Sequence, residues 1–189
     1  MNNRDIFKRQ IQSLSKRIAT EYNFALYRRT FLVREENNIV SMIVFDFPQS
    51  AMQFHVATQP LYVPSDILHI TFGYRFRRRN LNTMGYWGEH SDQFDSDIAE
   101  IESLILDEAF PFLQQTSSPY KIIELLNNGL PNEIKLPPHF KNTYLAYSLL
   151  MIKEYNSAIL PFTSVLTDLR QYVELVKKEV TTVNLMLSM

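Results

Sequence analysis

Residues 24–47, FALYRRTFLVREENNIVSMIVFDF, decide the fold that we expect for this chain. The stretch is rich in aromatic and β-branched residues, which favour strands. The residues EENN at 35–38 indicate a turn in its middle. The stretch therefore predicts two strands, residues 24–34 and 39–47, and strands joined by so short a connection pair antiparallel.

Two further strands are expected after this pair. Residues 51–58, AMQFHVAT, and residues 68–77, LHITFGYRFR, alternate apolar and polar side chains with a period of two. A longer connection with two prolines, residues 59–67, separates them. The four segments predict a four-stranded antiparallel meander, a sheet that can bury one face and leave the other in water.

An amphipathic helix is expected before the sheet, at residues 3–22. Its apolar positions recur at helical spacing and would cover the buried face of the sheet. Asn2 or Asn3 can cap its start. The fold class is therefore α+β, with a helix and an antiparallel sheet in residues 1–93 and a helical part in residues 94–189 packed on them as one compact unit.

The helical part carries its own start and stop signals. Asp95, Ser96 or Asp97 can cap a helix that Pro111 should kink or end. Ser118-Pro119 predicts another helix start, and Asn127-Asn128-Gly129 its stop.

Two longer helices are expected near residues 139–155 and 158–185. Apolar and small residues in this pair have the spacing of one tetratricopeptide-like hairpin, and with a single copy we interpret it as a generic αα-hairpin. They are Leu145, Ala146, Leu149, Ala158 and Phe162. Residues 173–189 stay apolar to the end, which predicts docking on the body or on a second subunit, so that the chain forms a homo-oligomer through its C-terminal helices.

Composition bounds the class of protein. The chain of 189 residues is 46% hydrophobic and contains no cysteine, which excludes disulfides and thiolate chemistry. The first twenty residues lack the apolar core of a signal peptide, and no apolar run is long enough to span a bilayer. These features favour a cytoplasmic protein without a membrane partner.

The net charge of −1 hides an asymmetry between two halves. Residues 1–90 carry a net charge of +5 and residues 91–189 a net charge of −6, and ten of the eleven arginines lie in the first half. One interpretation is that the halves face and partly neutralise each other. The other is that they are two surfaces with different partners.

The alternation within residues 68–77 separates aromatic rings from arginines. Phe72, Tyr74 and Phe76 should point into the core, and Arg75 should point to water. With the strands paired about residue 62, His55 should lie opposite position 69 on the polar face. The resulting candidate binding site, which could hold an anion, consists of Gln53, His55, His69, Thr71, Arg75, Arg77, Arg78 and Arg79.

Signals for catalysis are weak. There is no GxSxG, P-loop or GxGxxG pattern, and the histidines lack metal-ligand spacing, so we expect no cofactor and no metal. Asp92, Asp95, Asp97, Glu100 and Glu102 are interpreted as a solvated helix start. An enzyme that uses His55, His69 and Arg75 stays an alternative, and no residue is singled out as catalytic.

Two kinds of macromolecule fit the arginines of the fourth strand. Nucleic acid would contact Arg75 to Arg79, with Arg28, Arg29 and Arg34 as further contacts, and would bind in a salt-dependent manner. Against this stand a pI near 6.4 and the acidic second half. An acidic protein partner fits the same side chains and is the preferred prediction.

The order of segments also resembles a known family. A helix, then FALYRRTFLVREENNIVSMIVFDF, then FHVATQPLYVPSDILHITFGYRF and AFPFLQQTSSPYKIIELL, is similar to the bacterial family of unknown function numbered 4304, over residues 3–126. The resemblance implies a small cytoplasmic α+β protein and carries over no active-site residue. Because some such families lie near toxin–immunity systems, it also implies a non-enzymatic interaction role of the inhibitor or immunity type.

Overall fold

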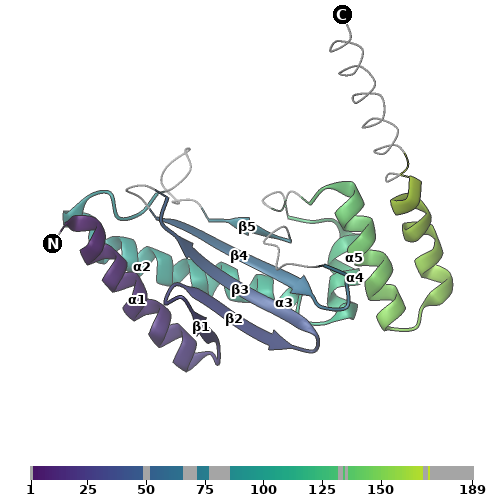
Figure 1. Ribbon diagram of the computed structural model, residues 1–189, viewed down its shortest axis with the longest axis horizontal. Helices are drawn as coiled ribbons and strands as arrows, with labels where there is room; N and C mark the ends of the chain where they lie inside the picture. Colours follow the sequence, from purple (N-terminus) through teal and green to yellow (C-terminus); the bar gives the residue numbers. More distant parts are fainter. Residues whose placement is uncertain are drawn as a thin grey trace, which may run out of the picture.

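A computed structural model describes residues 2–48, 52–65, 72–76, 86–131, 134, 136–167 and 170. The fold is α+β, with an N-terminal helix, an antiparallel sheet and C-terminal helices (Figure 1). The sheet has five strands in the order β1-β2-β3-β4-β5, and each pair of neighbours is antiparallel. They are β1 Ala25–Tyr27, β2 Phe31–Glu36, β3 Ile39–Asp46, β4 Gln53–Pro60 and β5 Gly73–Arg75. The predicted meander is confirmed, with one strand more than expected.

The extra strand arises because the predicted strand 24–34 is divided by a turn. Arg28 and Arg29 have φ angles of 51° and 63°, which lie in the left-handed region. Two such residues in succession reverse the chain, so that Tyr27 pairs with Phe31. The turn between β2 and β3 uses the same region at Asn37, and asparagine adopts it readily, whereas arginine gives no such signal in a sequence.

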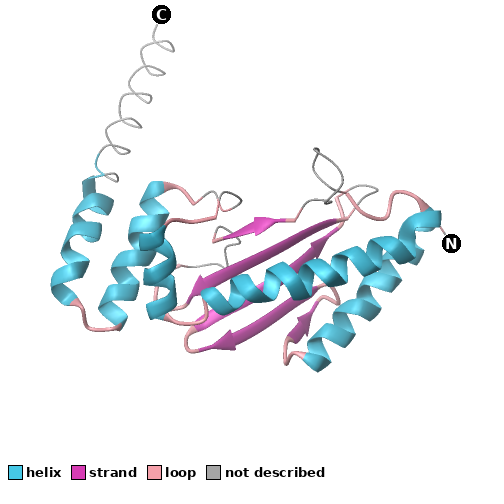
Figure 2. Ribbon diagram, turned by 180° about the vertical axis from the view of Figure 1, so that it is seen from behind, coloured by secondary structure: helices cyan, strands magenta, loops and turns pink. Residues whose placement is uncertain are grey.

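Helix α1, Asn3–Glu21, begins as predicted, since the side chain of Asn2 accepts a hydrogen bond from the backbone N–H of Asp5. It covers one face of the sheet together with α2, Phe94–Leu104, and α3, Phe110–Gln115 (Figure 2). The short 3-10 helix η1, Ser91–Gln93, precedes α2, so the predicted caps at residues 95–97 are wrong. Those residues lie within the first helical turn.

Helices α2 and α3 are joined by η2, Ile105–Ala109, a π-helical turn. Pro111 follows directly and lies in the first turn of α3. Because proline has no N–H and its ring crowds the carbonyl four residues earlier, a wider turn before it relieves both problems. The chain therefore continues as a helix through Pro111 to Gln115, where a kink or an end was predicted.

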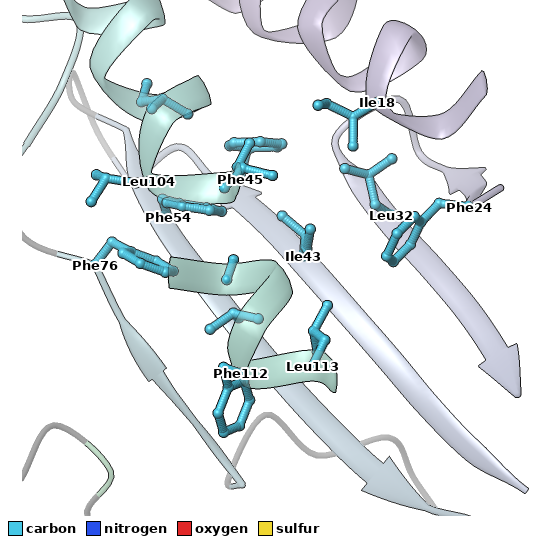
Figure 3. Close-up of a cluster of buried hydrophobic side chains, with 14 of the residues drawn as sticks. Ile18, Phe24, Leu32, Ile43, Phe45, Phe54, Phe76, Leu104, Phe112 and Leu113 are labelled. Carbon is cyan, nitrogen blue, oxygen red and sulfur yellow. The ribbon is translucent and has the colours of Figure 1, made fainter. Parts of the chain in front are cut away.

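The main core lies between this helical layer and the sheet (Figure 3). The rings of Phe45 and Phe76 stack on the two sides of Phe54, with centroid distances of 5.2 and 4.3 Å. Trp87 meets Phe54 edge-on at 6.5 Å and forms a β-bridge with Met52. Such aromatic contacts add to the free energy gained by removing the rings from water.

The remaining helices pack at the end of the sheet where β4 finishes (Figure 1). Helix α4, Pro119–Asn128, begins at Ser118 and is followed by Gly129 with a φ of 98°, as predicted. Helix α5, Pro138–Met151, docks through the ring of Tyr144, which stacks on Phe72 at 5.1 Å.

A hydrogen bond of 2.8 Å between the hydroxyls of Tyr62 and Ser148 also ties α5 to the sheet. Burial raises the pKa of Tyr62 to about 12, so its hydroxyl keeps its proton at neutral pH. A further helix over residues 155–167 lies against α5 and completes an αα-hairpin with it.

Candidate interaction surface

The second face of the sheet is not covered by any helix of the described residues, and Figure 1 views the molecule from this side. We call it the open face. One row of directly paired residues crosses it from edge to edge. It consists of Tyr27, Phe31, Val44, His55 and Arg75. Tyr27 and Arg75 at the two ends are exposed, and the three residues between them are half-buried. The row therefore presents two apolar side chains and an imidazole in its middle, with a phenol at one edge and a guanidinium at the other.

A second row on the open face is almost entirely apolar. It pairs Val33 with Met42, Met42 with Ala57 and Ala57 with Gly73. Met42 and Ala57 are fully buried, and with Val40 they form a small cluster separate from the main core. This face was expected to be wet and polar, and that expectation is wrong at its centre, where β3 carries apolar side chains in both directions.

Gly73 explains how β5 approaches this row so closely. A Cβ atom at this position would lie 2.0 Å from the carbonyl oxygen of Val56 and 2.8 Å from the Cβ of Ala57. Only glycine fits such an approach without moving the backbone. Gly73 thereby allows β5 to enclose Ala57, while Arg75, two residues further along β5, stays exposed.

His55 lies opposite Arg75, not opposite position 69. The partner of His55 lies six positions further along the chain than the sequence suggested, because β4 continues to Pro60. Burial is the main cause that lowers the pKa of His55, the positive charge of Arg75 lowers it further, and Asp46 acts in the opposite direction. The row thus holds a neutral imidazole beside a cation at neutral pH.

Three of the eight predicted site residues are in the described part of the chain, and the structure brings them together. Gln53 lies on the open face with His55 and Arg75, in the next row, where it pairs with Asp46. The predicted orientation of the fourth strand is confirmed over 72–76, where Phe72 and Phe76 are buried and Arg75 is exposed. The other five predicted residues, His69, Thr71, Arg77, Arg78 and Arg79, lie outside the described residues.

The remaining arginines of the first half do not join Arg75. Arg28 and Arg29 form the β1–β2 turn, at the opposite edge of the five-stranded sheet. Arg28 lies over the ring of Tyr27, at 5.2 Å from its centroid. Arg34 lies over the ring of Phe24 at 4.7 Å and donates to the carbonyl of Tyr22, which makes it part of the packing. With strands about 4.8 Å apart, β1 and β5 are separated by roughly 19 Å.

The acidic residues at the start of α2 were predicted to form a solvated face, which holds for the exposed Asp92 and Asp95 but is wrong for Asp97 and Glu100. Asp97 is 1% exposed, and its carboxylate accepts a 2.7 Å hydrogen bond from the backbone N–H of Gly88. Glu100 accepts from the indole N–H of Trp87. These carboxylates hold residues 86–88 against the helical layer. Only the tertiary structure brings Trp87 and Gly88 to α2, so no sequence pattern reveals the role.

Contacts between the basic and acidic halves also occur on the helical side. Arg17 donates two hydrogen bonds to Glu102, at 2.6 and 2.7 Å, and this bonding lowers the pKa of Glu102. Gln10 donates to Asp95 at 3.3 Å. A hollow of about 540 Å³ between α1 and α2 is lined by Gln10, Arg17 and Asp95 together with other side chains of the two helices, among them the apolar Leu14 and Ile98. No predicted site residue lines it, so it adds nothing to a catalytic interpretation of His55.

Two further observations concern the described residues alone. No three His, Asp or Glu side chains among them are grouped as the ligands of a metal ion. None of their helices is both long and apolar enough to cross a bilayer.

Comparison with known proteins gives no match to any family model, curated protein or solved structure. The resemblance to the family numbered 4304 therefore stays a prediction, and the properties of the open face are the basis for a functional proposal.

Proposed function

We propose that the protein is a non-enzymatic interaction module that binds an acidic protein partner with the open face of its sheet. The observation that carries the proposal is the row from Tyr27 to Arg75. It has the half-buried apolar side chains of Phe31 and Val44 and the half-buried imidazole of His55 in its middle, and Tyr27 and Arg75 are exposed at its ends. Protein interfaces have this composition, with an apolar centre and a polar rim in which tyrosine and arginine are enriched.

The charges at the rim favour carboxylates on the partner. Arg75 stands at one edge of the open face and Arg28 and Arg29 at the other, and a guanidinium pairs well with carboxylates. Burial, together with the positive charge of Arg75, lowers the pKa of His55 and keeps its imidazole neutral, so the cation of this row stands at its β5 edge. An inhibitor of the immunity type is one form that such a module takes.

The same geometry makes nucleic acid the weaker alternative. Phosphates along a strand require cations along a continuous track. Among the described arginines, Arg75 and Arg28 are at opposite edges of the sheet, and Arg34 packs against Phe24. Between the two edges, the backbone of a nucleic acid would meet the apolar side chains of Phe31 and Val44, which carry no charge to pair with its phosphates.

The experiment is a pull-down from the source organism with the wild-type protein and two charge-reversed variants. Arg75→Glu should abolish capture of the partner, whereas Arg9→Glu, an equal charge change on the exposed side of α1, should leave capture intact. The captured protein is then purified, and its affinity for each variant is measured by calorimetry. Equal affinity for wild type and Arg75→Glu would remove Arg75 from the contact.

A gel-shift experiment with mixed DNA and RNA at two salt concentrations tests the alternative. We expect no shift at low salt. A shift that weakens steeply with salt and is lost in Arg75→Glu would replace the protein partner by nucleic acid.

A further inference from the structure

The hollow between α1 and α2 is bounded at both ends by polar contacts between these two helices, which lie side by side (Figure 2). Gln10 donates to Asp95 at one end, and Arg17 donates to Glu102 at the other. Both contacts are separated by seven positions on each helix, so they lie about 10 Å apart. The hollow of about 540 Å³ has the size of a small-molecule pocket, since such pockets span about 300–1,000 Å³.

The wall of the hollow formed by α1 carries hydrogen-bond donors. Arg9, Ser13 and Arg17 occupy positions i, i+4 and i+8, so they are neighbours on one side of the helix. Arg9 and Ser13 are exposed, and the structure shows no side-chain hydrogen bond or ion pair from either to another described residue. A guanidinium beside a hydroxyl is well suited to bind a carboxylate. This wall therefore fits the negative end of a ligand.

The side of the hollow next to α2 carries acceptors. The carboxylate of Asp95 is exposed and receives a hydrogen bond of 3.3 Å from Gln10. The carboxamide oxygen of Gln10 is buried and accepts no hydrogen bond from any described residue. A buried acceptor without a donor costs free energy, and the carboxylate beside it favours a donor with a positive charge. These two groups therefore fit the positive end of a ligand.

Apolar side chains lie between the donors and the acceptors. Leu14 of α1 is buried, Ile98 of α2 is half-buried, and both line the hollow. They would be removed from water by an apolar group of a ligand, which makes its binding more favourable. The lining thus has three parts, each with its own chemistry.

We propose that the hollow between α1 and α2 binds an apolar α-amino acid, a small zwitterion with an apolar side chain. Its carboxylate pairs with the donors of α1, its ammonium group pairs with the acceptors next to α2, and its side chain lies on the two apolar residues. A ligand with only one of the two charges would leave one side of the hollow without a partner. The hollow lies on the helix-covered side of the sheet, so the proposal is independent of the open face and does not rest on the proposed function.

Calorimetry of the full chain with L-leucine tests the proposal, and the wild type should give saturable heat. Isocaproate lacks the ammonium group of leucine and isoamylamine lacks its carboxylate, so each should bind at least about tenfold more weakly. A wild-type protein that gives no saturable heat with L-leucine would overturn the proposal. If either analogue binds as tightly as L-leucine, the ligand is not a zwitterion and the proposal fails as well.

Variants of the two helices locate the site. Arg9→Glu should weaken the binding of L-leucine at least about tenfold, because it repels the carboxylate. Lys16→Glu is the matched control, since Lys16 is exposed on the same helix but does not line the hollow, and it should bind like the wild type.

Asp95→Asn keeps an acceptor for Gln10 but removes the negative charge, and it too should weaken binding of L-leucine at least about tenfold. Trp87 is fully buried in the body of the protein, so unchanged emission shows that the variants are folded. Folded Arg9→Glu or Asp95→Asn protein that binds L-leucine as tightly as the wild type would overturn the proposal.

Discussion

The two faces of the sheet come from the same five strands but are built in different ways. On the helix-covered face, Phe45, Phe54 and Phe76 stack ring on ring beneath α2 and α3. On the open face, smaller side chains such as Met42 and Ala57 are enclosed mainly by their neighbours in the sheet. The difference indicates that the helix-covered face contributes most of the stability of the fold. The open face buries only the side chains at its centre and keeps a row of partly exposed groups.

Truncation of one buried side chain on each face gives the largest expected effects. Phe54→Ala should reduce the free energy of unfolding by about 3–5 kcal/mol, because it removes the central ring of the stack. Met42→Ala should cost about 2 kcal/mol, at the low end for such a change, because the neighbours on an open face can close over the gap. Urea unfolding followed by far-UV circular dichroism measures both. Equal losses would mean that the open face supports the fold as strongly as the helix-covered face.

The carboxylate of Asp97 tests how residues 86–88 are held on the helix-covered side. Asp97→Ala should reduce the free energy of unfolding by about 1–3 kcal/mol, because it leaves the buried N–H of Gly88 without its acceptor. Asp95→Ala is the control, since Asp95 is exposed in the same helical turn. The same urea experiment applies to both. If the two variants lose equal stability, the buried hydrogen bond is not what anchors Gly88.

The pH dependence of stability probes His55 on the open face. The pKa of His55 in the folded protein is lowered from 6.5, so the unfolded chain binds a proton more readily. Stability is therefore fully present above pH 6.5 and is lost as the pH falls from there towards the lowered value. Urea unfolding at several pH values should show a smaller loss for His55→Gln than for the wild type. An identical pH dependence in both proteins would show that His55 is not held neutral on this face.

The smallest effect is expected for the exposed ion pair on the helical side. Arg17→Ala should reduce the free energy of unfolding by about 0.2–1 kcal/mol, since exposed pairs are screened by water and salt. Arg17 lowers the pKa of Glu102 from 4.5, so the contribution is present above pH 4.5 and is lost as the pH falls through the lowered value. Unfolding experiments at low and high salt should give converging values for the two proteins. A loss that salt does not change would mean that the aliphatic part of Arg17 matters more than its charge.

The sequence by itself determined the elements whose signals are local. Two-residue alternation placed Phe54 and Val56 on one face of β4 and His55 on the other, and Asn2, Ser118 and Gly129 marked helix ends correctly. Alternation and capping depend on a few neighbouring residues, so they can be recognised in a sequence. The turn at Arg28 and Arg29 was missed because arginine does not favour the left-handed region that it adopts there.

Only the tertiary structure decided which residues meet across the chain. The pairing of His55 with Arg75 depends on how far β4 extends, and a shift in register changes every partner. The burial of Asp97 depends on the return of Gly88 to α2, nine positions away along the chain. Such contacts join segments whose separate sequences carry no sign of each other, because the energy that selects them comes from packing the whole core.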